Sequence, residues 1–246
     1  MTSQINTSAH PSSVYRLLAG LTLTCALAGG LLPTNAAHAQ VPPSAPEVAQ
    51  FAALHAAAHQ GDVAKIEKLI ATKANLNARD PYGRTAVHVA TFAKARDVIR
   101  ALAKAGAQLE LLESDRYDAV TIASVADDDE TLKVLLSVGA SAKLTTSRYD
   151  GTALIAAAHL GHDGVVKQLI AAGAPLDHVN NLHWTAMIES IVLGNGGTRH
   201  QNVLRALIAA RANTQLTDRL GTTPLALAKS RGYEAMVTML EKAGAR

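Results

Sequence analysis

The sequence predicts an all-α solenoid made of about six helix-turn-helix units. Two observations predict it: a short motif recurs at a fixed distance before a repeated dipeptide, and an apolar stripe at helical spacing follows each motif. The dipeptides, spaced by 33, 33, 34, 38 and 33 residues, are Lys73-Ala74, Gly106-Ala107, Gly139-Ala140, Gly173-Ala174, Arg211-Ala212 and Gly244-Ala245. Periods of this length are typical of stacked repeats, each of which is one supersecondary unit.

The first predicted element, residues 1–39, has the features of a secretory signal peptide. Residues 17–39 carry no charge, follow Arg16 and end in the small-residue sequence Ala37-His38-Ala39. We expect cleavage after Ala39, a periplasmic location and no membrane span in the mature chain. The alternative is a membrane anchor, but Gly20, Gly29, Gly30 and Pro33 interrupt the apolar stretch. Lipid attachment at Cys25 is the minor alternative, because Thr22 and Thr24 do not match a lipidation box. Residues 40–46 contain three prolines and are predicted to be an extended linker.

The units begin on related tetrapeptides, five of which lie 21 residues before the dipeptide. These are Ala52-Ala53-Leu54-His55, Thr85-Ala86-Val87-His88, Asp118-Ala119-Val120-Thr121, Thr152-Ala153-Leu154-Ile155 and Thr223-Pro224-Leu225-Ala226; the fifth unit has Thr185-Ala186-Met187-Ile188, 26 residues before its dipeptide. With Gly161-His162 at a turn between helices, this pattern resembles the ankyrin-repeat family. The resemblance covers residues 47–246 and implies helix pairs joined by β-hairpin loops, with units of about 47–79, 80–112, 113–146, 147–179, 180–217 and 218–246.

The second helix of each unit is predicted from apolar residues three and four positions apart, as in Val63, Ile66, Leu69 and Ile70. One such stripe cannot be buried within its own unit, so neighbouring units must stack. Two departures from the repeat have expected consequences. Asp118 replaces the opening Thr and should cap its helix with a carboxylate, and units one and five, which lack the terminal Gly, should have less regular turns.

Composition and motifs exclude several functions. The chain has 23 basic and 20 acidic residues and no basic run, which argues against nucleic-acid binding. Signal cleavage would remove the single cysteine and with it disulfides and thiolate chemistry. No nucleophile-elbow, phosphate-loop or dinucleotide motif occurs. The spacings of His55 with His59 and of His159 with His162 are compatible with metal binding, but the resemblance assigns structural roles to several of these histidines. We therefore predict a monomeric non-enzyme without cofactor or metal.

A contact surface is predicted on the concave side, where the resemblance places the hairpin tips and the exposed ends of the first helices. Six of the seven aromatic residues after position 39 fall at such positions, and none falls in the predicted core. Exposed Tyr and Trp are typical of protein interfaces; the alternative is that they pack on one another along the hairpins. The predicted partner-binding residues are Phe51, Tyr82, Arg84, Phe92, Asp115, Tyr117, Arg148, Tyr149, Asp150, His159, His183, Trp184 and Arg219.

The fifth unit supplies a second candidate site, in a longer turn rich in glycine. Backbone N–H groups there could hold an anion or a small ligand. Glu189 occupies a position that is apolar in the other units and should bond to Arg199, His200 or a loop amide. The residues of this candidate site are Glu189, Asn195, Gly196, Gly197, Arg199 and His200.

The prediction is an exported interaction module that binds a protein or peptide. Residues 180–200 resemble a stretch of secreted bacterial ankyrin-repeat proteins, some of them associated with catalase and oxidative-stress defence. The resemblance implies a family-specific site without identifying what it binds. We expect the module to stabilise, assist or inhibit a periplasmic partner, and a catalase-type enzyme or a toxin would each fit. The alternative function is a ligand-binding or catalytic site at the loop of the fifth unit.

Overall fold

A computed structural model describes residues 42–246; the predicted signal peptide and the start of the linker lie outside this range. The described residues form these helices: α2 (Ala45–Ala49), α3 (Ala53–Gln60), α4 (Val63–Ala71), α5 (Ala86–Phe92), α6 (Arg96–Lys104), α7 (Ala119–Val125), α8 (Asp129–Ser137), α9 (Ala153–Leu160), α10 (Asp163–Ala171), α11 (Ala186–Val192), α12 (Thr198–Ala209), α13 (Pro224–Ser230) and α14 (Glu234–Lys242). None of them is long and apolar enough to cross a bilayer.

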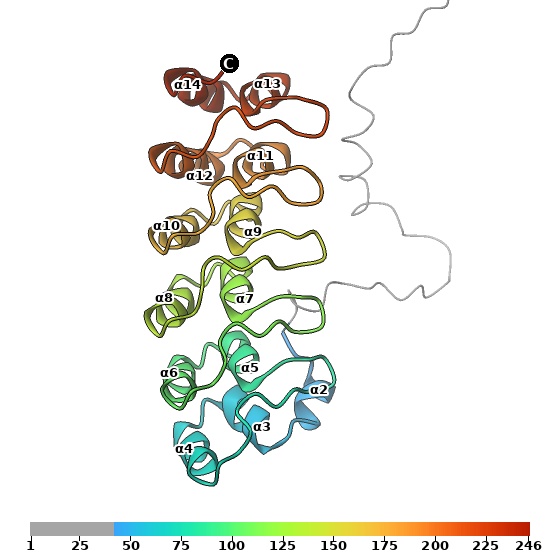
Figure 1. Cartoon of the computed structure of the whole chain (residues 1–246), viewed down its shortest axis with the longest axis vertical. Helices are drawn as coiled ribbons and strands as arrows, with labels where there is room; N and C mark the ends of the chain where they lie inside the picture. The colour runs from blue at the N-terminus through green and yellow to red at the C-terminus, as the bar shows by residue number, and fades with distance from the viewer. Residues whose placement is uncertain (1–41) are drawn as a thin grey trace, which may run out of the picture. The chain divides into compact units, whose positions relative to one another are not determined.

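The helices form two stacked columns, as the sequence pattern predicts. Figure 1 shows the inner column, α3, α5, α7, α9, α11 and α13, next to the loops that connect successive units. The outer column, α4, α6, α8, α10, α12 and α14, lies on the side away from these loops. The apolar stripes of the outer helices are buried between the columns, with Ile66, Ile99, Leu132, Leu169 and Leu204 fully covered. Small residues such as Ala57, Ala90 and Ala157 let the inner helices pack closely.

Helix starts are capped by the residues that the repeat supplies. The Asp118 carboxylate accepts a hydrogen bond of 2.9 Å from the backbone N–H of Thr121, which confirms the expected carboxylate cap. Asp128 caps α8 in the same way, with 3.0 Å to the N–H of Thr131. These side chains satisfy donors that a helix start leaves without an internal partner.

The linker prediction needs one correction. Its last two residues, Ala45 and Pro46, already belong to α2. Ser44 and Glu47 form a reciprocal capping box around the start of this helix, and proline is well accepted in a first helical turn. The proline therefore begins a helix here instead of extending the chain.

The prediction of less regular turns after the first and fifth units is wrong. Lys73 and Arg211 adopt the left-handed conformation, with φ of 59° and 67°, that Gly106 adopts in the second unit. The N–H groups of Lys73 and Ala74 bond to Ile70 and Leu69, the same arrangement as at Gly106 and Ala107. The turn is therefore fixed by its hydrogen bonds, and the non-glycine residue bears the conformational cost.

Replacing Lys73 or Arg211 by glycine is expected to stabilise the fold by about 0.5 to 1 kcal/mol each, because glycine relieves the left-handed strain but gains freedom in the unfolded chain. Urea denaturation measures this change. Lys68→Gly, in the interior of α4, is the matched control and should destabilise by about 1 kcal/mol. A loss of stability in Lys73→Gly comparable to the control would contradict the strain argument.

Candidate functional site

The loops that connect successive units form a regular row along the inner helices (Figure 1). In each loop one polar side chain accepts hydrogen bonds from the backbone N–H groups two and four residues later. Oδ1 of Asn180 accepts from the backbone N–H groups of Leu182 and Trp184, both at 3.0 Å. The corresponding residues of the other loops are Asp80, Glu113, Ser147 and Asp218. The loops are thus rigid although, within residues 42–246, their pairing amounts to a single β-bridge between Thr146 and Gly151.

Neighbouring loops are also bonded to each other. The N–H groups of Ser114, Ser147 and Asn181 donate to the carbonyl oxygens of Tyr82, Arg116 and Tyr149. Between the third and fourth units two ion pairs cross in opposite directions, Arg148 to Asp115 at 2.9 Å and Arg116 to Asp150 at 3.4 Å. Exposed pairs of this kind contribute little stability, but they hold adjacent tips in register.

The predicted partner-binding residues differ widely in exposure. Six are exposed: Arg148, Tyr149, Asp150, His159, His183 and Arg219. Four are half-buried: Phe51, Tyr82, Phe92 and Asp115. Three are buried: Arg84, Tyr117 and Trp184. The expectation that no aromatic lies in the core is therefore wrong for Tyr117 and Trp184.

The physical reason is the packing between adjacent units. Tyr117, the loop residue before the N-cap of α7, packs with Ile122 of its own unit and with Phe92 of the preceding one. These positions meet only when the units stack, so a position beside the surface becomes part of an apolar cluster. The alternative reading, in which aromatics pack on one another along the loops, holds for this part of the row.

Arg84 is buried for a different reason. It bonds to Asp80 at 2.6 Å, lies 3.6 Å from Glu47 of α2, and its guanidinium stacks on the rings of Tyr82 and Phe51 at 4.5 and 5.7 Å. The Glu47 pKa lies below its ordinary value through hydrogen bonds at the helix start and to Tyr82, although partial burial alone would raise it. Arg84 therefore anchors α2 to the first units.

Glu189 is buried on α11 and is bonded by an amide of the loop before that helix, not by Arg199 or His200. Its Oε1 accepts a hydrogen bond of 2.8 Å from Nδ2 of Asn180, and its Oε2 lies 3.7 Å from Nδ1 of His159 on α9. Burial raises the pKa of Glu189 to about 7, and the Asn180 amide only partly offsets this effect. Burial and the nearby His200 and His162 lower the pKa of His159, which favours its neutral form.

The glycine-rich loop of the fifth unit is filled by its own side chains. The His200 ring lies between Oδ1 of Asn195 at 3.0 Å and the carbonyl oxygen of His159 at 2.9 Å. The Tyr233 hydroxyl donates to the carbonyl oxygen of Gly194 at 2.9 Å, and the Tyr233 ring covers Gly196. Thr198, Arg199 and His200 belong to the first turn of α12 instead of the loop. Compared with the second and third units, the five additional residues of the fifth unit therefore lengthen the loop by two residues and the outer helix by three.

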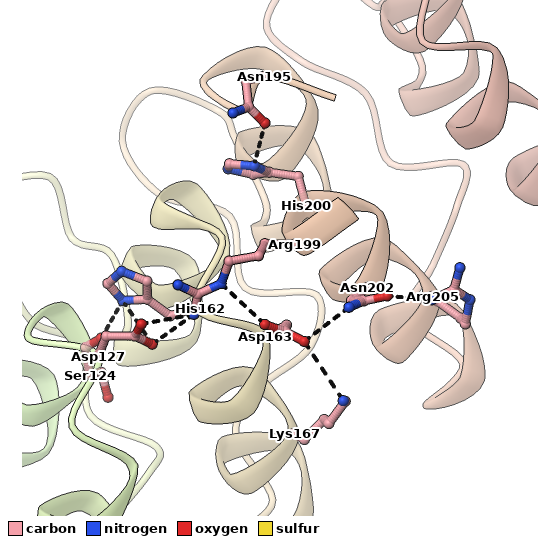
Figure 2. A network of polar contacts seen from close by, with 10 residues as sticks. All are labelled: Ser124, Asp127, His162, Asp163, Lys167, Asn195, Arg199, His200, Asn202 and Arg205. Carbon is pink, nitrogen blue, oxygen red and sulfur yellow. Dashed lines mark hydrogen bonds and ion pairs between the residues drawn. The ribbon is translucent and has the colours of Figure 1, made fainter. Parts of the chain in front are cut away.

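Arg199 joins three successive units, as Figure 2 shows. Its guanidinium binds both carboxylate oxygens of Asp127, at 2.8 and 2.9 Å, and Oδ1 of Asp163 at 3.2 Å. Nδ1 of His162 donates to the carbonyl oxygen of Ser124 at 2.9 Å and lies 3.9 Å from Oδ1 of Asp127. Units of a solenoid usually contact only their neighbours, so this link from unit five to unit three is specific to the longer α12.

His55 and His88 have structural partners. The rings of His55 and His88 contact the carbonyl oxygens of Arg84 and Tyr117 in the next loop, at 2.9 and 3.2 Å, as the family resemblance implies. Burial lowers the His88 pKa to about 4, so this ring is neutral near pH 7. Among the described residues no group of three or more His, Cys, Asp or Glu could hold a metal ion.

Two surface features escaped the sequence analysis. Leu220, in the loop of the sixth unit, is 62% exposed, and Val179, in the loop between the fourth and fifth units, is 42% exposed; both lie on the same row as Tyr149. An aliphatic residue in a loop gives no signal of its own, but alignment of the loops would have placed Leu220 at the tip occupied by Tyr82 and Tyr149.

Comparison with known proteins agrees with this architecture. A family model described as ankyrin repeats in three copies matches residues 26–113 and 120–218. A putative ankyrin repeat protein of Escherichia coli is 33% identical over 190 residues, which are 77% of this chain and 94% of that protein. The chicken nuclear factor NF-kappa-B p105 subunit is 29% identical over 69% of this chain and 17% of its own length.

The solved structure of an ankyrin repeat domain from Acinetobacter baumannii is similar to this one. It superimposes with a TM-score of 0.74 and 40% identity, covering 78% of this chain and 98% of that domain. The paired helices, the loop row and the sequence matches agree on one assignment. The chain belongs to the ankyrin-repeat family, a fold that serves in general as a non-catalytic module for protein-protein interaction.

Proposed function

We propose that this protein is exported to the periplasm and binds a protein or peptide partner there through the loop row and the adjoining inner-helix ends, without catalysis. The observation that carries the proposal is the Tyr149 side chain, which is 50% exposed at the tip of the fourth-unit loop. Exposed aromatic side chains on a rigid scaffold are frequent anchors of interfaces.

The backbone around Tyr149 is held on both sides. Its N–H donates to Oγ of Ser147 at 3.2 Å, and its carbonyl oxygen accepts from the N–H of Asn181 at 3.0 Å. The flanking Arg148 and Asp150 are held by ion pairs to the preceding loop. Binding would therefore order few additional groups, and Leu220 and Val179 extend the apolar part of the row.

The partner is expected to be another periplasmic protein, which the module would stabilise, assist or inhibit. A catalase-type enzyme or a toxin would fit this role. The glycine-rich loop of the fifth unit offers less support for the alternative function, because His200 and Tyr233 occupy its interior.

Photo-crosslinking tests the surface directly. Replacing Tyr149 by the photoreactive p-benzoylphenylalanine should give a discrete crosslinked protein when cells expressing the full chain are irradiated. The same substitution at Tyr233, beside the fifth-unit loop and away from the tips, is the control and should give none. Equal crosslinking at both positions, or none at Tyr149, would contradict the proposed surface.

The Tyr149→Ala variant should keep its fold, whereas Tyr117→Ala would open the apolar cluster with Phe92 and Ile122.

A further inference from the structure

The inner-helix surface between the fourth and fifth units differs from the equivalent place between the second and third. There, Phe92, Tyr117 and Ile122 close an apolar cluster. The same three repeat positions two units further along the solenoid hold His159, Trp184 and Glu189. A buried carboxylate thus stands where an apolar contact would complete the packing, a substitution that costs free energy unless a partner compensates it.

Within residues 42–246, the Glu189 carboxylate accepts a single hydrogen bond. Asn180 serves Oε1, while Oε2 lies 3.7 Å from the His159 ring, beyond hydrogen-bond distance. A carboxylate oxygen pair can accept about four hydrogen bonds. The Glu189 side chain is 7% exposed and that of His159 is 44% exposed, so the ring lies between the carboxylate and solvent.

No charged group on the surrounding helices neutralises this carboxylate within the described part of the chain. On α12, Arg199 is bound to Asp127 and Asp163, and His200 lies between Asn195 and the His159 carbonyl. On α13, Lys229 forms an ion pair of 2.8 Å with Glu241. On α9, His159 is the titratable residue that approaches Glu189, and its neutral form is favoured.

We propose that Glu189 is the receptor for a cationic group of the partner, a lysine ammonium or an arginine guanidinium, which enters beside His159 and binds the carboxylate. This inference rests on the proposed function and adds the chemistry that the partner must present. Charge complementarity identifies the occupant: a cation supplies both the missing donors and the missing charge, whereas an anion would be repelled and an apolar group would leave the carboxylate unsatisfied. His159 turns aside to admit the cation.

The protein contains its own reporter for this site. Trp184 is the single tryptophan of the chain, and its backbone N–H donates to Oδ1 of Asn180, the residue whose Nδ2 donates to Glu189. A cation bound at the carboxylate should perturb this hydrogen-bond chain. Trp184 fluorescence and the amide NMR shifts of residues 180 and 189 therefore report occupancy.

The experiment titrates the purified chain with N-acetyl-lysine methylamide and N-acetyl-arginine methylamide, with the uncharged norleucine analogue as the matched probe. We expect saturable shifts with the two cations only. Because protons compete for a carboxylate whose pKa is about 7, binding should be about tenfold weaker at pH 6 than at pH 8. Equal response to norleucine, or affinity independent of pH over this range, would overturn the proposal.

Three variants complete the test. Glu189→Gln should abolish the shifts, and His159→Ala should keep or strengthen them because it leaves the carboxylate and removes the ring beside it. Glu113→Gln is the control, since Glu113 is equally buried but bonded to the N–H groups of Asp115 and Tyr117, and it should bind like the parent. Retained binding in Glu189→Gln refutes the cation site. Crosslinking at Tyr149 would still stand in that case, so failure of this inference is distinct from failure of the proposed function.

Discussion

Replacing Glu189 by glutamine is expected to stabilise the protein by about 3 kcal/mol at pH 8 and to have almost no effect at pH 4. Glutamine keeps an amide oxygen that can accept from Asn180 but carries no charge to bury. The size of the effect follows from the Glu189 pKa, which burial raises from the ordinary 4.5 to about 7. Each unit of that difference corresponds to about 1.4 kcal/mol between the two protonation states.

The sign of this pH dependence is fixed by proton uptake. Between pH 4.5 and 7 the folded chain holds a proton at Glu189 that the unfolded chain has lost, so stability falls as pH rises through this window. Below it both states are protonated, and above it both are ionised. Thermal or urea unfolding of parent and variant from pH 4 to 8 measures the difference. Glu234→Gln, exposed at the start of α14, is the control and should show no such trend; a constant difference across the range would contradict the argument.

The arrangement of the fold was predictable because it depends on local signals that recur. The opening tetrapeptides place the inner helices, the apolar stripes place the outer helices, and both types of signal are repeated in every unit. The anomaly of Glu189 was visible for the same reason, since five equivalent positions are apolar. The partner of Glu189 could not be predicted, because Asn180 lies in a loop and its side chain also accepts hydrogen bonds from two backbone N–H groups.

Exposure at the loop row could not be predicted from residue type. Tyr117 and Tyr149 are both loop tyrosines, yet Tyr117 is 7% exposed and Tyr149 is 50% exposed. The difference depends on the place within the loop and on the neighbouring unit, which supplies Phe92 against Tyr117. Likewise, the contact of Arg199 with Asp127 spans 72 residues and exists because α12 has 12 residues where α10 has nine. Neither depends on a local pattern.

Replacing Gly194 by alanine is expected to destabilise the protein by about 3 kcal/mol, the upper range for forcing a methyl group into a packed site. A Cβ at Gly194 would overlap the carbonyl oxygen of Ser190 and lie 2.6 Å from Cδ2 of the His200 ring. The backbone of α11 cannot shift to relieve this overlap without losing the Tyr233 hydrogen bond to the Gly194 carbonyl. Circular dichroism with urea denaturation measures the loss.

Gly197→Ala is the matched control within the same loop. Its nearest neighbour would be the Asn195 side chain at 3.0 Å, which can move, and Gly197 has an ordinary φ of −74°. As Gly197 is the N-cap of α12, the expected loss is below about 1 kcal/mol. Similar losses of stability in Gly194→Ala and Gly197→Ala would show that the loop needs flexible residues in general. That result would contradict a specific steric requirement for glycine beside the His200 ring.

Gly161 allows the overlap with the His200 ring to be measured separately from the overlap with the Ser190 carbonyl oxygen. At Gly161, in the turn after α9, the three heavy atoms nearest to an added Cβ would all belong to the His200 ring, at 2.8 to 3.1 Å. Removing the ring should therefore rescue part of the loss in Gly161→Ala, leaving the cost of a φ of +73°. The same removal should leave Gly194→Ala almost unchanged, because the Ser190 carbonyl remains in place. Double-mutant cycles with His200→Ala measure this coupling. Strong coupling at Gly161 and weak coupling at Gly194 would show that the glycines of the fifth unit serve packing between units, with no ligand required.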